Sequence, residues 1–234
     1  MHNFTIVVMN KYPELASNLI KSLVKLHPVK TPDIFIVRDN HDTEFDHARG
    51  VTVNEPFLPS RNINIGISSN PGKDILFCND DMQCTDINFA YRLGQIAHSY
   101  SKCGILSPLI DGGVGNEWQQ FPMMDAWSHV PGTEIAIDRT VCFPCVYIKR
   151  AMIDAIGMMD EAFVDYGFED DDMCIRARAA GWMTMITSRL SIKHGEGGNH
   201  LQHGRNWSLT YARSNPEMKS NLEVFLTKYP QLAK

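Results

Sequence analysis

Four adjacent acids, Glu169–Asp172, are the residues in this sequence best suited to chemistry. Adjacent carboxylates repel one another unless something cationic shares the site. A short helical pattern over residues 173–180 follows them and ends at Gly181. The acids are therefore expected at a helix N-terminus, where the helix dipole favours negative charge. The run predicts either a solvated acidic helix start or a catalytic base beside a metal or a sugar.

The four acids need not share one role. Asp172 and Arg176 lie four residues apart, so we expect them to pair on one face of the helix. Asp171 is expected to face solvent. Glu169 and Asp170 then remain beside the preceding loop, where a substrate would be within reach.

Alternating buried strands and helices must position these acids. Such an alternation predicts an α/β fold with a Rossmann-like, mainly parallel central sheet flanked by helices on both faces. Strands are expected at 4–9, 33–40, 50–54, 74–81, 104–110, 133–140, 141–149, 183–187 and 191–194, and helices at 13–27, 60–69, 86–102 and 150–157. A further helix begins near Pro216. We expect one domain over residues 1–204, with a helical appendage over residues 205–234.

Polar side chains collect where the predicted strands end. In a parallel sheet, ligands bind beyond the carboxyl ends of the strands. The residues at these positions are Asn10, Asp39, Asn40, Asn79, Asp80, Asp81 and His194. Carboxylates and an imidazole from separate strands, together with substrate oxygens, would form an octahedral site for Mn²⁺ or Mg²⁺. Such an ion would neutralise a diphosphate and assist its departure.

Composition excludes few classes of protein. The net charge of −5 gives no sign of a nucleic-acid partner, and no apolar run approaches the roughly 18 residues of a membrane helix. The N-terminal residues lack the features of a signal peptide, so a cytoplasmic location is expected. The sequence has neither a G-x-G-x-x-G nor a P-loop motif. The close pair Cys142 and Cys145 has strand-like flanks, which favours buried free thiols over a zinc or redox site.

The long segment 111–133 has no clear period. A loop of this length in a compact domain is usually functional or mobile. Its aromatic residues Trp118, Phe121 and Trp127 suit either stacking on a sugar or ordinary packing of the loop.

The acidic stretch resembles glycosyltransferase family 2, whose members are nucleotide-sugar-dependent enzymes with the GT-A fold. The resemblance covers most of the chain. Its most specific part comprises Gly157, Asp160-Glu161, Glu169-Asp170, Asp172 to Cys174, Arg176 and Gly181-Trp182. Arg61-Asn62 with Asn64 and Gly66 resembles an Asn-rich helix of the family, and Asn79-Asp80-Asp81 falls at its D-x-D metal motif.

The resemblance implies a role for each matching residue. Asp170 would be the general base that takes a proton from the acceptor, and Glu169 would hold a sugar or acceptor hydroxyl. Asp81, His194 and Asn79 would bind the metal, which is Mn²⁺ or Mg²⁺. The donor nucleotide and its sugar would contact Asn10, Asp39, Asn40, Arg61, Asn64 and Asp80. Lys193, Arg205 and Arg213 are candidates for the remaining charge of the diphosphate.

The implied activity is metal-dependent, inverting transfer of one sugar from a nucleoside-diphosphate sugar, with UDP-sugar favoured. The acceptor would be a hydroxyl on a glycan or small molecule, with a modified DNA base as an alternative. Formation of a homodimer is a further possibility. Gln202, Arg205 and Trp207 approach the Q-x-x-R-W motif of processive synthases but with one extra residue, so we expect single addition.

Two other classes compete with this reading. Asn79 replaces the first acid of the D-x-D motif, which lowers the expected metal affinity. The alternative is a non-catalytic sugar-nucleotide or glycan-binding protein of the same fold. A nucleotidyltransferase is disfavoured, because no Gly-rich loop follows the first strand.

Overall fold

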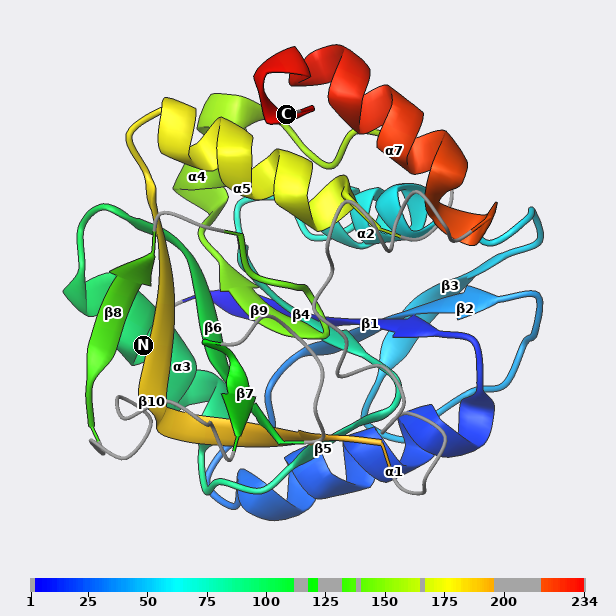
Figure 1. Cartoon of the computed structure of the whole chain (residues 1–234). Coiled ribbons are helices and arrows are strands. Elements are labelled where there is room, and N and C mark those ends of the chain that lie inside the picture. Colours follow the sequence, from blue (N-terminus) through cyan, green and yellow to red (C-terminus); the bar gives the residue numbers. More distant parts are fainter. Residues whose placement is uncertain are drawn as a thin grey trace.

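A computed structural model of the chain describes residues 3–111, 118–121, 132–137, 140–164, 167–195 and 216–233. They form an α/β fold in which one sheet lies between two layers of helices (Figure 1). Helices α1 (Pro13–Leu26) and α3 (Phe89–Ser99) cover one face. Helices α2 (Pro59–Ser68), α4 (Arg150–Ile156) and α5 (Glu169–Ala179) cover the other. The predicted fold class is confirmed.

The described residues contribute ten strands to the sheet. The strands are β1 (Phe4–Asn10), β2 (Ile34–Asp39), β3 (Arg49–Val53), β4 (Asp74–Asn79), β5 (Met82–Cys84), β6 (Cys103–Asp111), β7 (Gln120–Phe121), β8 (Glu134–Ile137), β9 (Cys145–Ile148) and β10 (Met183–His194). Their order is β3-β2-β1-β4-β9-β6-β10-β5, with β7 paired to β6 and β8 paired to β10.

One half of the sheet is parallel and the other is mixed. Strands β3, β2, β1 and β4 are parallel neighbours. Strand β9 then lies antiparallel to both β4 and β6, while β10 runs parallel to β6. The carboxyl ends of β1, β2, β4, β6 and β10 therefore meet at one edge, which is the edge predicted to bind a ligand.

Alternation along the buried strands divides the core between the two faces. In β1, Ile6 and Val8 pack toward α1 and α3, whereas Val7 packs toward α2. Every residue of β1 is buried, as expected of a central strand. Burying a large aliphatic or aromatic side chain contributes about 1.5–3 kcal/mol, so these two layers supply most of the stabilisation.

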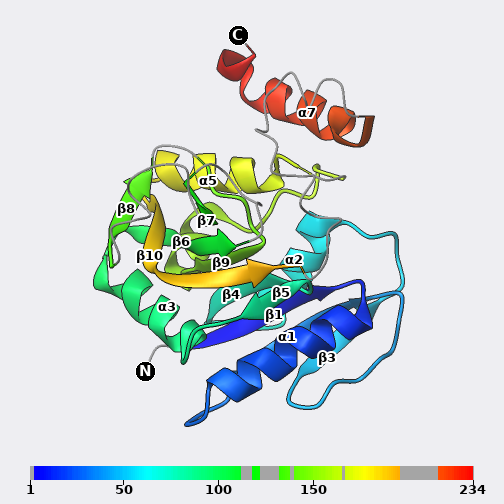
Figure 2. The same cartoon turned by 60° about the horizontal axis from the view of Figure 1, so that its bottom comes forward.

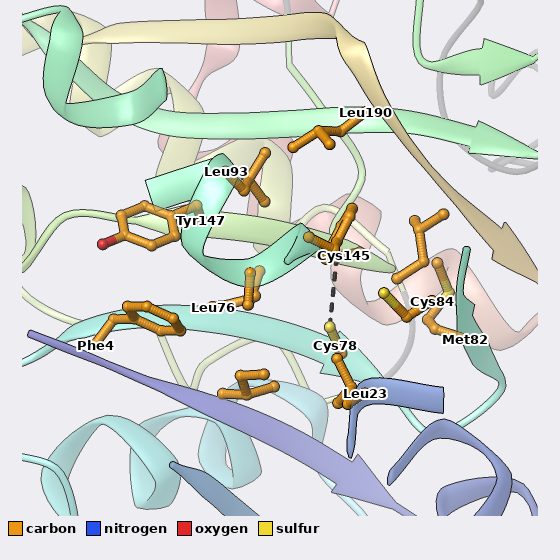
Figure 3. Packing of buried hydrophobic residues seen from close by; sticks show 14 of the residues in the cluster. Phe4, Leu23, Leu76, Cys78, Met82, Cys84, Leu93, Cys145, Tyr147 and Leu190 are labelled. Carbon is orange, nitrogen blue, oxygen red and sulfur yellow. Dashed lines mark hydrogen bonds between the residues drawn. The ribbon is translucent and has the colours of Figure 1, made fainter. Parts of the chain in front are cut away.

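The layer beneath α1 and α3 contains several thiols (Figure 3). The Sγ atoms of Cys78 and Cys145 lie 3.4 Å apart on paired strands, and both residues are fully buried. All six cysteines are free, which agrees with the prediction of buried thiols for Cys145. Cys142 differs, because it is only partly buried in the loop before β9.

Several element boundaries differ from the predictions. Helix α5 begins at Glu169 and not at Met173, so the acids belong to its first turn. The predicted strand 74–81 ends at Asn79 and turns into the short strand β5, which the sequence pattern did not indicate. The predicted strands 183–187 and 191–194 are one strand, β10, with an irregular register between Thr187 and Ser191.

The predicted strand 141–149 is also shorter, because β9 begins only at Cys145. Pro144 has no N–H to donate and is poorly suited to a central strand. Its carbonyl instead accepts a hydrogen bond from the backbone N–H of Asn79 at 2.9 Å.

The C-terminal helix α7 (Pro216–Lys228) lies beyond α5 as seen from the sheet (Figure 2). It packs on α5 and on the segment that precedes α5 through a small apolar cluster. The predicted boundary between residues 204 and 205 lies outside the described residues. Within the described part of the chain, no helix is both long and apolar enough to cross a membrane.

Candidate active site

Asp80 fixes the loop between β1 and α1 at the carboxyl edge of the sheet. Its Oδ2 accepts hydrogen bonds from Asn10 Nδ2 at 3.0 Å and from the backbone N–H groups of Lys11 and Tyr12, both at 2.8 Å. Burial raises the pKa of Asp80, and these hydrogen bonds partly oppose the rise. Asn10 and Asp80, both predicted to contact the donor, are thus brought together. One oxygen of Asp80 is already used to shape the site.

Asp81 and His194 meet at the same edge. Strand β10 ends at His194, which lies opposite Met82 in the antiparallel pair with β5. His194 Nε2 lies 3.2 Å from Asp81 Oδ2, and the two side chains are only 7% and 14% exposed. Asp81 Oδ1 is buried and finds no hydrogen-bond partner among the described residues. An unsatisfied carboxylate oxygen beside an imidazole is a suitable start for a cation site.

The pair suits Mn²⁺ or Mg²⁺ in its donor atoms, which are a carboxylate oxygen and an imidazole nitrogen. The described residues contain no group of three His, Cys, Asp or Glu side chains that could hold a metal ion. Substrate oxygens and water would add to the ligands of a cation held by Asp81 and His194, as they commonly do for Mg²⁺.

Asn79, the third predicted metal ligand, ends β4 opposite Met9. Alternation along the strand places it on the same face as Phe77, which packs with residues of α2 and α5. Its backbone is held by Pro144, and its side chain is partly exposed. Asn79 thus lies on the face of the sheet that carries α5, two residues before Asp81.

The acidic turn, Glu169–Asp172, is the first turn of α5, which begins at the same edge of the sheet. Burial makes the carboxyl groups of Glu169 and Asp170 weak acids with raised pKa values, although part of each side chain reaches the surface. Burial raises the pKa of Glu169 to about 7, and the charge of Asp171 adds to the rise. Burial and the charges of Asp171 and Glu169 raise the pKa of Asp170 well above its usual value. At physiological pH, a carboxylate with a pKa near neutrality is a stronger proton acceptor than one with an ordinary pKa.

The carboxyl groups of the acidic turn differ in their hydrogen bonds. Asp170 Oδ1 accepts a hydrogen bond from the backbone N–H of Asp171 at 2.8 Å. Glu169 Oε2 is buried and has no hydrogen-bond partner within the described part of the chain. The pKa of the partly buried Cys142 is raised by burial and by Asp170 and Asp171, so this thiol lies beside the acids. Cys142 is a neighbour of the site that sequence reasoning missed.

Asp172 pairs with Arg176 as predicted, with Arg176 Nε 2.7 Å from Asp172 Oδ2. The prediction that Asp171 faces solvent is wrong. Asp171 is partly buried and accepts a hydrogen bond from the Thr140 side chain, which together with Arg178 opposes the rise in its pKa caused by burial. The loop before β9 covers this side of the turn, which the sequence alone could not indicate.

Helix α2 contributes mainly structural contacts. Asn64 donates to Met159 O at 3.0 Å and to Glu161 Oε1 at 2.8 Å, and it accepts from the backbone N–H of Met159. Arg61 pairs with Glu55. Both were predicted to touch the donor, but these contacts position the segment after α4 and the loop before α2.

Asn62, between these two residues, differs from both. It is fully buried, and neither atom of its amide has a hydrogen-bond partner among the described residues. It belongs to the Arg61-Asn62 pair that resembles the family pattern, and this was the signal that could have marked it.

The ends of β1 and β2 form a second polar group. Asn40 Nδ2 donates to Asp39 Oδ1 at 2.8 Å, and Asn40 takes a left-handed conformation with φ of 54°. Beside them, Lys11 Nζ lies 5.8 Å from the ring centroids of Tyr12 and of Phe57. Tyr12 is 49% exposed, which is unusual for so large a ring. An exposed ring next to polar strand ends suits contact with a nucleobase.

Other predicted contacts are only partly described. Trp118 packs at the margin of the core on the α2 and α5 face, so it has a packing role. The side chains of Phe121 and Trp127 lie outside the described residues, as do Gln202, Arg205, Trp207 and Arg213. Lys193 lies on β10 opposite Gln83.

Two cavities flank the sheet at opposite edges. One of about 490 Å³ adjoins Asp80 and Asp81 and is also lined by Lys21 and Lys25 of α1. Another of about 770 Å³ lies at the amino ends of the strands, where Lys73 and Arg49 pair with Asp33. The larger cavity touches none of the predicted site residues, so its size gives no reason to move the site.

Comparisons with known proteins support the fold. The crystal structure of GalNAc-T7 with UDP, GalNAc and Mn²⁺ is similar to this chain with a TM-score of 0.66 and 12% sequence identity. The similarity covers 98% of this chain and 57% of that chain, so this chain spans little more than half of its structural neighbour. The likeness confirms the predicted GT-A fold.

Sequence comparisons add little to this. The uncharacterized protein y4gI of Sinorhizobium fredii is 36% identical over 52 residues, which make up 22% of this chain and 6% of that protein. No family model matches the chain, and membership of glycosyltransferase family 2 stays a prediction.

Proposed function

We propose that the protein is a family 2 glycosyltransferase that moves one sugar from a nucleoside-diphosphate sugar to an acceptor hydroxyl, with inversion and with a divalent cation. The observation that supports it best is the arrangement of two unlike acidic groups at one edge of a GT-A sheet. One is Asp81 beside His194, and the other is the acidic turn. Inverting transfer needs positive charge at the leaving diphosphate and a base near the acceptor.

Asp81 and His194 would hold the cation, Mn²⁺ or Mg²⁺. When bound, it supplies positive charge that offsets the charge developing on the departing diphosphate. Asp80 fixes the loop that borders this position, and its second oxygen would contact the sugar or ribose. Asn79 would contact the cation or the sugar through its carbonyl.

Asp170 would take the proton of the acceptor hydroxyl. Its raised pKa makes its carboxylate a stronger base than an ordinary aspartate. Glu169 would hold a hydroxyl of the sugar or acceptor through the Oε2 atom that is unpaired among the described residues. A buried oxygen of this kind gains a hydrogen bond when a substrate enters.

The nucleoside would lie on the ends of β1 and β2. Asp39 and Asn40 offer hydrogen-bonding groups there, and the exposed ring of Tyr12 offers a stacking surface. UDP is the favoured nucleotide, and the similar structure of GalNAc-T7 contains UDP and Mn²⁺. The acceptor would be a hydroxyl of a glycan or small molecule.

Thermal unfolding tests the donor site directly. UDP, GDP, CDP and dTDP are compared with and without Mn²⁺, and a ligand that binds only the folded state raises the melting temperature. We expect UDP with Mn²⁺ to give the largest rise. If none of the four nucleotides gave a metal-dependent rise, the proposed donor site would be disproved.

A catalytically inactive sugar-nucleotide-binding protein is the second candidate. It is favoured by Asn79 in place of an acid in the D-x-D position. Release of UDP from UDP-GalNAc by the unmodified protein separates the two, because a binding protein would raise the melting temperature without turnover.

A further inference from the structure

Helix α7 contacts the residues that lead into the acidic turn. Asn221 Nδ2 donates to the carbonyl of Gly167 at 2.9 Å. The ring of Phe225 lies 4.9 Å from that of Phe168. Phe168 precedes Glu169 directly and has a φ of 72°, a conformation that costs a bulky residue about 1–3 kcal/mol. The packing of α7 therefore helps to hold the strained residue from which α5 starts.

The same helix supplies charge to the end of the acidic turn. Asp172 is fully buried, and its Oδ1 lies 2.5 Å from Lys228 Nζ and accepts a hydrogen bond from Tyr229 Oη at 2.8 Å. Arg176 binds the other oxygen. Lys228 also pairs with Asp160 at 2.6 Å. A buried carboxylate is strongly destabilising when it loses its partners, so these contacts stabilise Asp172 in its buried position.

The negative charge of Asp172 acts on its neighbour in the acidic turn. It raises the pKa of Asp171, although burial is the larger cause there. The charge of Asp171 in turn raises the pKa values of Glu169 and Asp170, again after burial. The carboxylates of the turn thus interact as neighbours, Asp172 with Asp171, and Asp171 with Glu169 and Asp170.

We propose that α7 is a positioning element for the acidic turn, with Lys228 and Tyr229 holding Asp172 so that Glu169 and Asp170 keep their place and charge. The proposal rests on the function proposed above, because the acidic turn is its catalytic part. Lys228 and Tyr229 act through Asp172, so they are positioning residues and not catalytic ones.

The described titratable and charged groups around the acidic turn come from four parts of the chain. They lie in α5, in the loop before β9, in the segment after α4 and in α7, and they are Asp171, Asp172, Arg176, Arg178, Cys174, Cys142, Asp160, Lys228 and Tyr229. Lys228 can be changed without altering a proposed substrate contact, which makes it the best position for a test.

Lys228→Met removes the ammonium group and keeps most of the side-chain length. It should raise the pKa values of the Glu169 and Asp170 carboxyl groups, because the negative charge of Asp172 then has less positive charge beside it. These values are measured by NMR titration of protein labelled with ¹³C in its Asp and Glu carboxyl groups. The acidic limb of the pH profile for UDP-GalNAc turnover should move upward by the same amount.

Two further variants separate charge from packing. Lys228→Met combined with Asp172→Asn should bring both pKa values back toward those of the unmodified protein, since the extra negative charge is then gone. Lys219→Met removes an exposed lysine from the same helix and should leave both readouts unchanged. If Lys228→Met prevents folding, Tyr229→Phe removes a single hydrogen bond and should give a smaller shift in the same direction.

The proposal is overturned if a folded Lys228→Met or Tyr229→Phe protein keeps the original carboxyl pKa values, or if the double variant fails to restore them. The NMR titration needs no substrate. If the unmodified protein turned over no sugar nucleotide, the proposed function would fail on its own, and the titration would still decide the role of α7.

Discussion

Asp81 and His194 lie 3.2 Å apart, although one follows β4 and the other ends β10. The backbone N–H of Gly195 also donates to the carbonyl of Asp81 at 2.7 Å. The sheet thus brings a carboxylate and an imidazole together through both side-chain and backbone contacts, which gives the first prediction its basis.

Asp81→Asn should remove the Mn²⁺-dependent part of the stabilisation by UDP. A ligand at 100 times its dissociation constant stabilises a protein by about 2.7 kcal/mol, and the metal-dependent share should be lost with the carboxylate charge. Thermal unfolding with UDP, with and without Mn²⁺, measures it. Asp46→Asn, which removes an exposed carboxylate, is the matched control and should respond as the unmodified protein does.

Asp170→Asn should abolish transfer and leave donor binding nearly intact. The amide cannot accept the acceptor's proton, and loss of a general base typically costs 10²- to 10⁴-fold in rate. UDP-GalNAc turnover and UDP affinity by calorimetry are measured together. Equal loss of both would show that Asp170 belongs to the donor site and is not the base.

Glu169→Gln should stabilise the protein above pH 7. The pKa of Glu169 is raised from 4.5 to about 7, so the folded state holds its proton more tightly than the unfolded state. The contribution of Glu169 to the free energy of unfolding is therefore fully present below pH 4.5 and is lost as the pH rises through 7. It amounts to about 1.4 kcal/mol for each unit by which the folded and unfolded pKa values differ. Urea unfolding at pH 4.5 and 8 checks this. A variant with the same pH dependence as the unmodified protein would contradict the assignment.

Low pH should weaken the contact between α1 and α3. His27 Nδ1 contacts the carbonyl of Leu23 at 2.5 Å, and Nε2 accepts from the backbone N–H of Ala90 at 3.1 Å. Burial lowers the pKa of His27 because it penalises the charged imidazole, and the hydrogen bond with Leu23 partly opposes this. A protonated Nε2 could also not accept the bond from Ala90.

Below pH 6.5 the unfolded state would therefore bind a proton at His27 that the folded state does not bind. The free energy of unfolding should then fall as the pH drops from that value. His27→Ala should cost about 1–3 kcal/mol at pH 8 and show a smaller loss on acidification. Urea unfolding between pH 8 and 5 measures both effects. An unchanged slope in the variant would rule His27 out as the titrating group.

The order of elements could be predicted because the strands are buried and short. Continuous apolar runs such as that of β1 marked the central strands, and polar residues after them marked the ligand edge. The meeting of Asp81 with His194 followed from the same rule. Asp172 with Arg176 could be predicted from helix spacing alone.

Other features depend on contacts that local sequence does not encode. The start of α5 at Glu169 needs the unusual conformation of Phe168, which Phe225 from α7 helps to hold. The role of Asn64 depends on Met159, which lies far along the chain. The antiparallel direction of β9 is also nonlocal, since the same apolar run would fit either direction.

Strand β9 has a consequence for synthesis of the chain. It is the strand that pairs with both β4 and β6, so the parallel half of the sheet has an unpaired edge at β4 until residues 145–148 leave the ribosome. Exposed apolar strand borders pair readily with other chains. A nascent chain that stops before Cys145 would expose one border of β4 and would leave β6 without both β9 and β10, so a chaperone that shields β4 and β6 would help most during that interval.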